Sequence, residues 1–507
     1  MDTAKNPLDM SNYRIEQLPK MKKSRFEQWM SYVGAPLALL VFVWINWFSH
    51  ISFLTDPKQQ AMLAIFIASI ILWITEAVPN YLTSLLVILA IVLTGVTTEK
   101  VAFAQLGHPV MWLNILSFVL ASMLVKTQVA KRFALWFVIK FGKSASGVFF
   151  SFLIINVVLS AFISATTAKA AILLPIFMVV AAIFGATGGD NRNNFGRNLV
   201  LQNLFQINVG ASGFITGSGA NLLAGALIAG AMGWDLFSFQ DWFVAAFPLC
   251  ILLLLLGWFV GCKIFFPLKP EERKPQIEGG MEYLREELRK MGKMQFVEYK
   301  AIFIFVCVLA LWATDKQHGI SQTTVAFIGA VVALLPGIGI VKWNDVDIPW
   351  HLMIFSAGAY TLGAGLDATT LPGTLVDAGF NALGIDDQTP FWVLYLLLTG
   401  MMLFSALLFQ SKTMRALIFV PIAIGVAQKF GYPILSLSFP VALLVEHVYV
   451  LPFNSKPAAL LYTTNQYSWS DTFKFGITMM CIAWGMIIVW GETVLRWLGY
   501  TSGVFFN

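Results

Sequence analysis

Long apolar segments alternate with short polar connections along most of the chain. Eleven of these segments are long enough to cross a membrane as helices, which needs about 20 mostly apolar residues. The apolar runs are long rather than alternating, so the pattern of a β-barrel is absent. The predicted spans cover residues 33–50, 61–78, 81–97, 111–141, 199–232, 242–267, 299–315, 322–340, 350–375, 433–464 and 472–499.

Two further apolar segments, 147–184 and 391–428, each contain a polar break in the middle. The breaks read SATTAK and QSKTMR. Irregular backbone is tolerated at membrane depth only where protein covers it or a cavity solvates it. Each segment is therefore predicted to be a re-entrant hairpin that enters and leaves on the same side of the membrane.

The two halves of the chain repeat the same order of features. Ala165–Pro175 aligns with Ser411–Pro421, and Ile215–Gly225 aligns with Pro452–Tyr462. Each half thus has a hairpin with a polar tip, followed by a helix broken at a Gly/Ser/Asn/Pro loop. Because the halves enter their hairpins from opposite sides, they form an inverted-topology repeat, in which the substrate site lies near the midplane.

The predicted units are a cytoplasmic tail (1–30), a first repeat (31–267) with hairpin 147–184 and broken helix 199–232, a cytoplasmic linker (268–298), and a second repeat (299–507) with hairpin 391–428 and broken helix 433–464.

The distribution of charge predicts the orientation in the inner, cytoplasmic membrane. Basic residues are concentrated in the N-terminal tail and in the linker 268–298, and six predicted spans separate these two regions. The positive-inside rule places both in the cytoplasm. Residues 376–390 contain acids and no Lys or Arg, as expected outside. Eleven spans then place the C-terminus outside.

Composition supports an all-α polytopic membrane protein. Hydrophobic residues make up 58% of the 507 residues and charged residues only 12%. No soluble domain of this size has such a composition. The net charge of +6 follows from membrane-flanking loops, so nucleic acid is not a predicted partner. The four cysteines lack paired or metal-ligand spacing and are predicted to be packing residues. No Walker loop, metal cluster or nucleophile elbow appears, so the chain is not predicted to be an enzyme.

The candidate chemistry begins at the polar tip of the second hairpin. Lys412 and Arg415 are three residues apart and share a helix face, and Ser411 is a suitable N-cap. Two cations in the first turn oppose the helix dipole and are costly in hydrocarbon. Together with the helix N-terminus they form a candidate anion site. The alternative is that these side chains snorkel to the membrane surface or neutralise a buried acid.

Glu446 and His447 are an adjacent ionisable pair inside the tenth predicted span. Ionisable residues within a membrane are functional candidates. The pair could relay protons, because histidine titrates near neutral pH. Alternatively, Glu446 pairs with Lys412, Arg415 or Lys456.

Four sequence patterns resemble those of the divalent anion/sodium symporter family of dicarboxylate, citrate and sulfate transporters. These are WITEAVPNYLTSLL at Trp73–Leu86, the Lys126–Leu135 stretch, Ser238–Pro248, and an altered loop, LPFNSKPAALLY, at Leu451–Tyr462. The resemblance covers almost the whole chain, and the four patterns follow one another in the order and spacing typical of the family. The resemblance implies a homodimeric secondary transporter with an elevator-type cycle.

The chain departs from the family pattern where sodium is expected to bind. Family hairpin tips usually read Ser-Asn-Thr, but here they read Ala165-Thr166-Thr167 and Ser411-Lys412-Thr413. A lysine ammonium has no lone pair and cannot be a metal ligand, but it can supply the charge that sodium would bring. The second-half sodium site is therefore predicted to be replaced by Lys412 and Lys456. A sodium site in the first half remains an alternative, although the positive charge of the nearby Lys169 disfavours it.

The function favoured by these features is sodium-independent exchange of small organic di- or tricarboxylate anions. The alternatives are sodium- or proton-coupled symport of a dicarboxylate, sulfate or sulfonate and, more distantly, an anion channel. The predicted partners are the small anion, the lipid bilayer and a second copy of the chain. The predicted substrate-binding residues are Ser411, Lys412, Thr413, Arg415, Lys456, Ser455 and Asn454, with Thr166, Thr167, Ser218 and Asn221 opposite. The candidates for cation or proton coupling are Ser164, Lys169, Gly217, Glu446 and His447.

Overall fold

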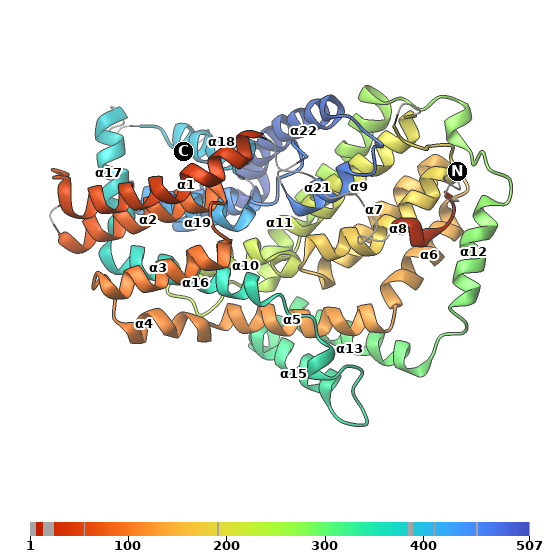
Figure 1. The fold of residues 1–507 in the computed structure, drawn as a ribbon, viewed down its shortest axis with the longest axis horizontal. Coiled ribbons are helices and arrows are strands. Elements are labelled where there is room, and N and C mark those ends of the chain that lie inside the picture. The colour runs from red at the N-terminus through yellow and green to blue at the C-terminus, as the bar shows by residue number, and fades with distance from the viewer. Residues whose placement is uncertain are drawn as a thin grey trace.

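The computed structural model describes residues 7–13, 25–54, 56–189, 192–383, 389–409, 411–452 and 455–505. These residues form α-helices joined by short turns, and the described part of the chain contains no β-strand (Figure 1). In chain order the α-helices are α1 (Arg25–Val43), α2 (Pro57–Thr75), α3 (Asn80–Leu93), α4 (Glu99–Ala104), α5 (Pro109–Lys126), α6 (Val129–Phe141), α7 (Ala145–Phe162), α8 (Thr166–Ile183), α9 (Asn194–Ser212), α10 (Gly219–Met232), α11 (Phe239–Phe259), α12 (Gly280–Lys290), α13 (Phe296–Ala313), α14 (Asp315–His318), α15 (Gln322–Leu334), α16 (Trp350–Thr369), α17 (Leu371–Leu383), α18 (Phe391–Phe404), α19 (Lys412–Lys429), α20 (Ile434–Leu443), α21 (Lys456–Tyr462) and α22 (Trp469–Trp490).

Several of these helices can cross a membrane, as expected for a multi-pass membrane protein. Seven helices of the described chain are long and apolar enough by length and composition, and six further apolar helices are shorter. The predicted count of eleven spans is therefore not established. Hydropathy does not detect helix ends, so a single apolar segment can contain two helices. The predicted span 111–141 divides into α5 and α6 at Gln128, whose φ of 57° is left-handed.

The polar breaks in the apolar segments are interruptions of helices. In the first predicted hairpin, α7 and α8 are joined by the non-helical residues 163–165. In the second, α18 continues as a short 3-10 turn (η9, Ser405–Leu407), and α19 begins after Ser411. The predicted broken helices divide likewise, into α9 and α10 in the first half and α20 and α21 in the second.

Helices from the two halves pack together in the centre of the molecule. α19 contacts α10 and α20, and α21 contacts α8 and α9. Around this centre, α1, α2, α3 and α16 pack together, and α5 packs with α13 and α15 along one edge (Figure 1). The central packing brings the polar breaks of both halves into one region.

Residues 10–13 of the N-terminal tail pack against the body of the protein. Residues Met10–Tyr13 form a 3-10 turn (η1) that contacts α8, and Met10 is buried. The linker 268–298 contains α12, which packs on α6. Arg132 on α6 fastens this contact, because its guanidinium donates to the carbonyls of Met291 and Gly292 and pairs with Glu298 at 2.7 Å.

Candidate functional site

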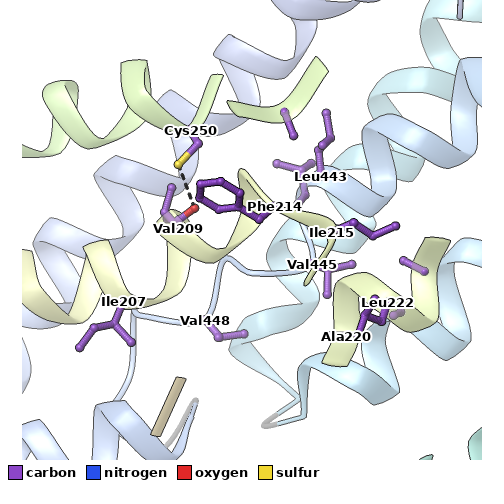
Figure 2. Close-up of a cluster of buried hydrophobic side chains, with 14 of the residues drawn as sticks. Ile207, Val209, Phe214, Ile215, Ala220, Leu222, Cys250, Leu443, Val445 and Val448 are labelled. Atoms are coloured by element: carbon purple, nitrogen blue, oxygen red, sulfur yellow. Dashed lines mark hydrogen bonds between the residues drawn. The ribbon is translucent and has the colours of Figure 1, made fainter. Parts of the chain in front are cut away.

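The two interrupted helices meet through an apolar cluster that fixes their breaks side by side. Phe214 and Ile215 come from the break between α9 and α10, and Val445 and Val448 come from the break between α20 and α21 (Figure 2). All four side chains are at most 5% exposed. This packing holds the backbone of 444–450, which is not helical, at the centre of the protein, where its polar groups need partners.

Glu446 lies in this break and is the carboxylate on which the site is built. Its side chain is fully buried, and Lys412 Nζ lies 2.6 Å from its Oε2. The hydroxyl of Ser218 donates a short hydrogen bond to Oε1. Lys412 Nζ also lies 3.5 Å from Thr166 Oγ1. The pairing of Glu446 with Lys412 was one of the two alternatives that the sequence left open, and the structure shows this pairing.

The Lys412–Glu446 pair belongs to the second half of the chain, and its hydrogen bonds with Ser218 and Thr166 connect it to the first half. Lys412 is the first residue of α19, Thr166 is the first residue of α8, and Ser218 caps α10. Burying two charges is tolerated only when they are paired and hydrogen-bonded, and here the Lys412 and Glu446 charges sum to zero. Lys412 keeps 13% side-chain exposure. Its ammonium is therefore the charged group through which a second carboxylate could compete with Glu446.

Arg415 is one turn further along α19 and is fully buried. Its Nε donates to Ser405 Oγ at 2.9 Å and its Nη1 to the carbonyl of Val445 at 3.0 Å. Its Nη2 donates to the carbonyls of Met402 and Leu403. The guanidinium thus fastens the end of α18 and the break before α21 to α19, and the described protein occupies its donors.

Lys169 on α8 is also fully buried. Its Nζ lies 2.8 Å from Ser160 Oγ on α7. No carboxylate lies within ion-pair distance of it among the residues that the structure describes. A buried ammonium with a single neutral partner is costly, which makes Lys169 a candidate for gaining and losing a proton.

The first-half break contains oxygen atoms that could bind a cation. Asn221 Nδ2 donates to the carbonyls of Ala211 and Phe214 at 2.9 and 3.0 Å. Its Oδ1 and Thr216 Oγ1 are buried without a hydrogen-bond partner in the described chain. Oxygen atoms are the ligands that hard cations prefer. At Gly217 a Cβ would lie 2.2 Å from the Ala211 carbonyl, so only glycine fits there.

The other predicted residues are distributed around this centre. Ser455 caps α21, with its Oγ accepting from Ala458 N at 3.3 Å, whereas Lys456 is exposed. His447 is buried and has a different partner from Glu446, since its Nδ1 lies 2.8 Å from the hydroxyl of Tyr449. Ser411, Thr413 and Thr167 are half-buried at the helix starts, Ser164 is buried just before α8, and Asn454 lies outside the described residues.

Sequence reasoning did not identify several polar residues that complete this region. Ser160 and Ser405 are the side-chain partners of the two buried cations. α9 carries a row of buried amide side chains. Two of them, Asn203 and Gln206, have their side-chain oxygens 3.0 Å from Asn156 Nδ2 on α7. The detectable signal was the set of amides three or four residues apart inside an apolar segment, Asn198, Gln202, Asn203 and Gln206.

Comparison with known proteins gives consistent matches over most of the chain. Residues 29–501 match the family model described as sodium:sulfate symporter transmembrane region. The chain is 27% identical over 441 residues to the sodium-dependent dicarboxylate transporter SdcS of Staphylococcus saprophyticus, covering 82% of this chain and 83% of that one. It is 24% identical over 496 residues to SdcS of Staphylococcus aureus (strain USA300), covering 93% and 92%.

The fold also resembles that of a solved transporter. The crystal structure of the YdaH transporter of Alcanivorax borkumensis aligns with a TM-score of 0.50, covering 94% of this chain and 99% of that one. Only 14% of the residues are identical, so this similarity concerns the fold alone.

Proposed function

Because the chain belongs to the sodium:sulfate symporter family, we propose that it carries small organic di- or tricarboxylate anions across the membrane without sodium. The dicarboxylate substrate class is supported by the SdcS relatives. Independence from sodium is supported by one observation in particular: the ammonium of Lys412 lies 2.6 Å from buried Glu446 in the region where both halves meet. A tethered cation there supplies the positive charge that a coupling ion would otherwise bring.

In this proposal, the substrate carboxylate replaces Glu446 as the partner of Lys412. Charge-assisted hydrogen bonds from the ammonium and from nearby hydroxyls would hold it. Arg415 acts as a positioning residue in this scheme, because its donors are taken by backbone carbonyls and Ser405. The proposed contacts are Ser411, Lys412, Thr413, Ser455, Lys456 and Asn454 on one side and Thr166, Thr167, Ser218 and Asn221 on the other.

Anion exchange is the first form of this transport. Glu446 and the substrate compete for one ammonium, so an incoming anion can take the place of an outgoing one at Lys412 before Glu446 pairs with it again. Unpaired cations in the empty site would favour exchange most strongly, because moving them through the membrane without an anion is costly. Lys412 is instead paired in the structure, which lowers the cost of moving the empty site and removes that part of the argument for exchange.

The same ion pair supports proton-coupled symport as a second candidate. A dianion that takes Lys412 leaves Glu446 buried and negatively charged beside it, and a proton on Glu446 or on Lys169 would offset that cost. Sodium coupling through the oxygens of Thr216 and Asn221 is a third form.

In the wider proposal, the protein is an elevator-type homodimer of the inner membrane with its N-terminus in the cytoplasm and its C-terminus outside, as the family resemblance and the charge pattern imply.

The first prediction concerns sodium. We expect anion counterflow in proteoliposomes to change by less than about twofold when choline replaces sodium, since Lys412 already provides the positive charge. A fall of about tenfold, equivalent to ~1.4 kcal/mol, would contradict the proposal. In that case, Thr216→Val and Asn221→Leu would identify whether the first-half oxygens bind the ion.

The second prediction separates exchange from proton coupling. Efflux of preloaded dicarboxylate into anion-free buffer would be measured on either side of neutral, at about pH 6 and about pH 8. Exchange predicts slow efflux at both values and recovery when external anion is added. Efflux that is fast only at the lower value would support proton coupling, and Glu446→Gln should then remove the pH dependence.

A further inference from the structure

A cavity lies outside the candidate site, between the linker helix α12 and the helices α6, α7 and α13. Its volume is about 790 Å³, within the range of cavities that bury small ligands. Apolar side chains form most of its wall, including Phe133 and Trp136 on α6, Leu159 on α7, and Phe305 and Val306 on α13. The cavity therefore suits a hydrocarbon chain rather than a polar solute.

Exposed apolar side chains lie on the α13 side of this cavity. Ile302 and Val306 line it and are 36% and 56% exposed, and the neighbouring Phe303 is 69% exposed. α13 is long and apolar enough to cross the membrane, and most of its surface is not covered by protein. Because exposed apolar side chains of a spanning helix face the bilayer, acyl chains can reach the cavity from the side.

The charged residues that line the cavity are all arginines: Arg132, Arg285 and Arg289. Glu298 pairs with Arg132 at 2.7 Å and neutralises it. Arg285 and Arg289 share a single carboxylate, that of Glu282, at 2.8 and 3.3 Å. These three side chains together carry one net positive charge. The Arg285 and Arg289 side chains are 46% and 74% exposed, so both guanidiniums can turn to another anion.

We propose that this cavity binds one anionic phospholipid of the surrounding leaflet. Its acyl chain would lie between α6, α7 and α13, and its phosphate would accept hydrogen bonds from Arg285 and Arg289. Guanidinium groups bind phosphate oxygens in a bidentate manner, and basic pockets beside transmembrane helices are suited to anionic headgroups. The bound lipid joins the linker helix to one helix of the first predicted hairpin and to the spanning helix α13.

The test is photolabelling of the full chain in phosphatidylcholine vesicles that contain a trace of lipid probe. Two probes carry the same diazirine acyl chain, one with a phosphatidylglycerol headgroup and one with phosphatidylethanolamine. We expect the phosphatidylglycerol probe to label peptides of α6 and α13, and the phosphatidylethanolamine probe to label them severalfold less. The double variant Arg285→Gln/Arg289→Gln should reduce phosphatidylglycerol labelling by about tenfold or more, because both phosphate contacts are lost.

Two further variants separate site-specific binding from general lipid contact. Arg273→Gln removes one exposed arginine from the same linker, outside the lining of this cavity, and should leave labelling unchanged. Val158→Trp fills the apolar end and should reduce labelling by both probes. Gel-filtration profiles establish that each variant is folded. Equal labelling of parent and double variant, equal labelling by the two headgroups, or cross-links to a second copy across this cavity would each overturn the proposal.

Discussion

Replacing Glu446 by Gln is expected to destabilise the protein by about 3–5 kcal/mol, the usual effect of removing one member of a buried ion pair. The loss arises because Lys412 keeps its charge in a region where it is only 13% exposed and its carboxylate partner is gone. The double variant Lys412→Met/Glu446→Gln should recover most of the loss, because neither charge then remains buried. Unfolding of the purified variants in detergent, combined as a double-mutant cycle, measures the coupling.

The matched control for this cycle is the pair at the other end of the same helix. Lys429 lies 2.7 Å from Asp377, but the Asp377 side chain is 59% exposed. Exposed pairs contribute about 0–1 kcal/mol, so the Lys429→Met/Asp377→Asn cycle should give a small coupling. Similar couplings in the two cycles would show that the Lys412–Glu446 pair is not the buried centre described above.

The double variant also addresses transport. With Lys412 replaced, the proposed site loses its charge-assisted contact with the substrate carboxylate. Anion affinity should fall by about ten- to a hundredfold, corresponding to ~1.5–3 kcal/mol. A folded double variant with unchanged affinity would place the substrate elsewhere.

Replacing Arg415 by Met is the second change with a large expected effect, about 2–6 kcal/mol of stability, because each of two buried carbonyls left without a donor costs about 1–3 kcal/mol. The variant leaves the carbonyls of Met402 and Val445 without their donor, and buried carbonyls need one. Arg415→Lys should recover less than half of the loss, because one ammonium cannot replace a guanidinium fork. Unfolding curves and folded yield in detergent measure the effect.

Binding assays distinguish this positioning role from direct substrate contact. The Arg415→Lys protein that folds should bind the anion with an affinity within about threefold of the parent. The anion-site interpretation of Arg415 predicts instead a loss as large as that of the Lys412→Met/Glu446→Gln variant. A loss of that size in well-folded Arg415→Lys would restore Arg415 to the substrate contacts.

The family resemblance seen in the sequence is confirmed by the family match over residues 29–501. The helix interruptions were also predictable, because each coincides with a polar cluster in an apolar run, as at Thr166 and Ser218. The count of eleven spanning helices stays a prediction, and hydropathy does not mark helix ends such as the left-handed Gln128.

The partners of the buried cations were harder to predict for a physical reason. Arg415 donates mainly to backbone carbonyls, which every residue carries and which no side-chain pattern marks. Ser160 and Ser405 are single small polar residues in apolar segments, where serine is also common without a partner. The contact of Ser218 with Glu446 joins residues 228 positions apart, and only the packing of the two breaks brings them together.

The internal neutrality of the Lys412–Glu446 pair has a consequence for how voltage acts on the proposed carrier. The Lys412–Glu446 pair itself moves no net charge when the empty site crosses the membrane. The buried guanidinium of Arg415 adds one positive charge to the empty and the loaded form alike, and a bound dianion adds its two negative charges. Each elementary charge is worth about 2.3 kcal/mol per 100 mV, so the membrane potential acts differently on the loaded and on the empty form. One-for-one exchange of equally charged anions is then silent electrically, whereas net movement of an anion without a proton generates a current.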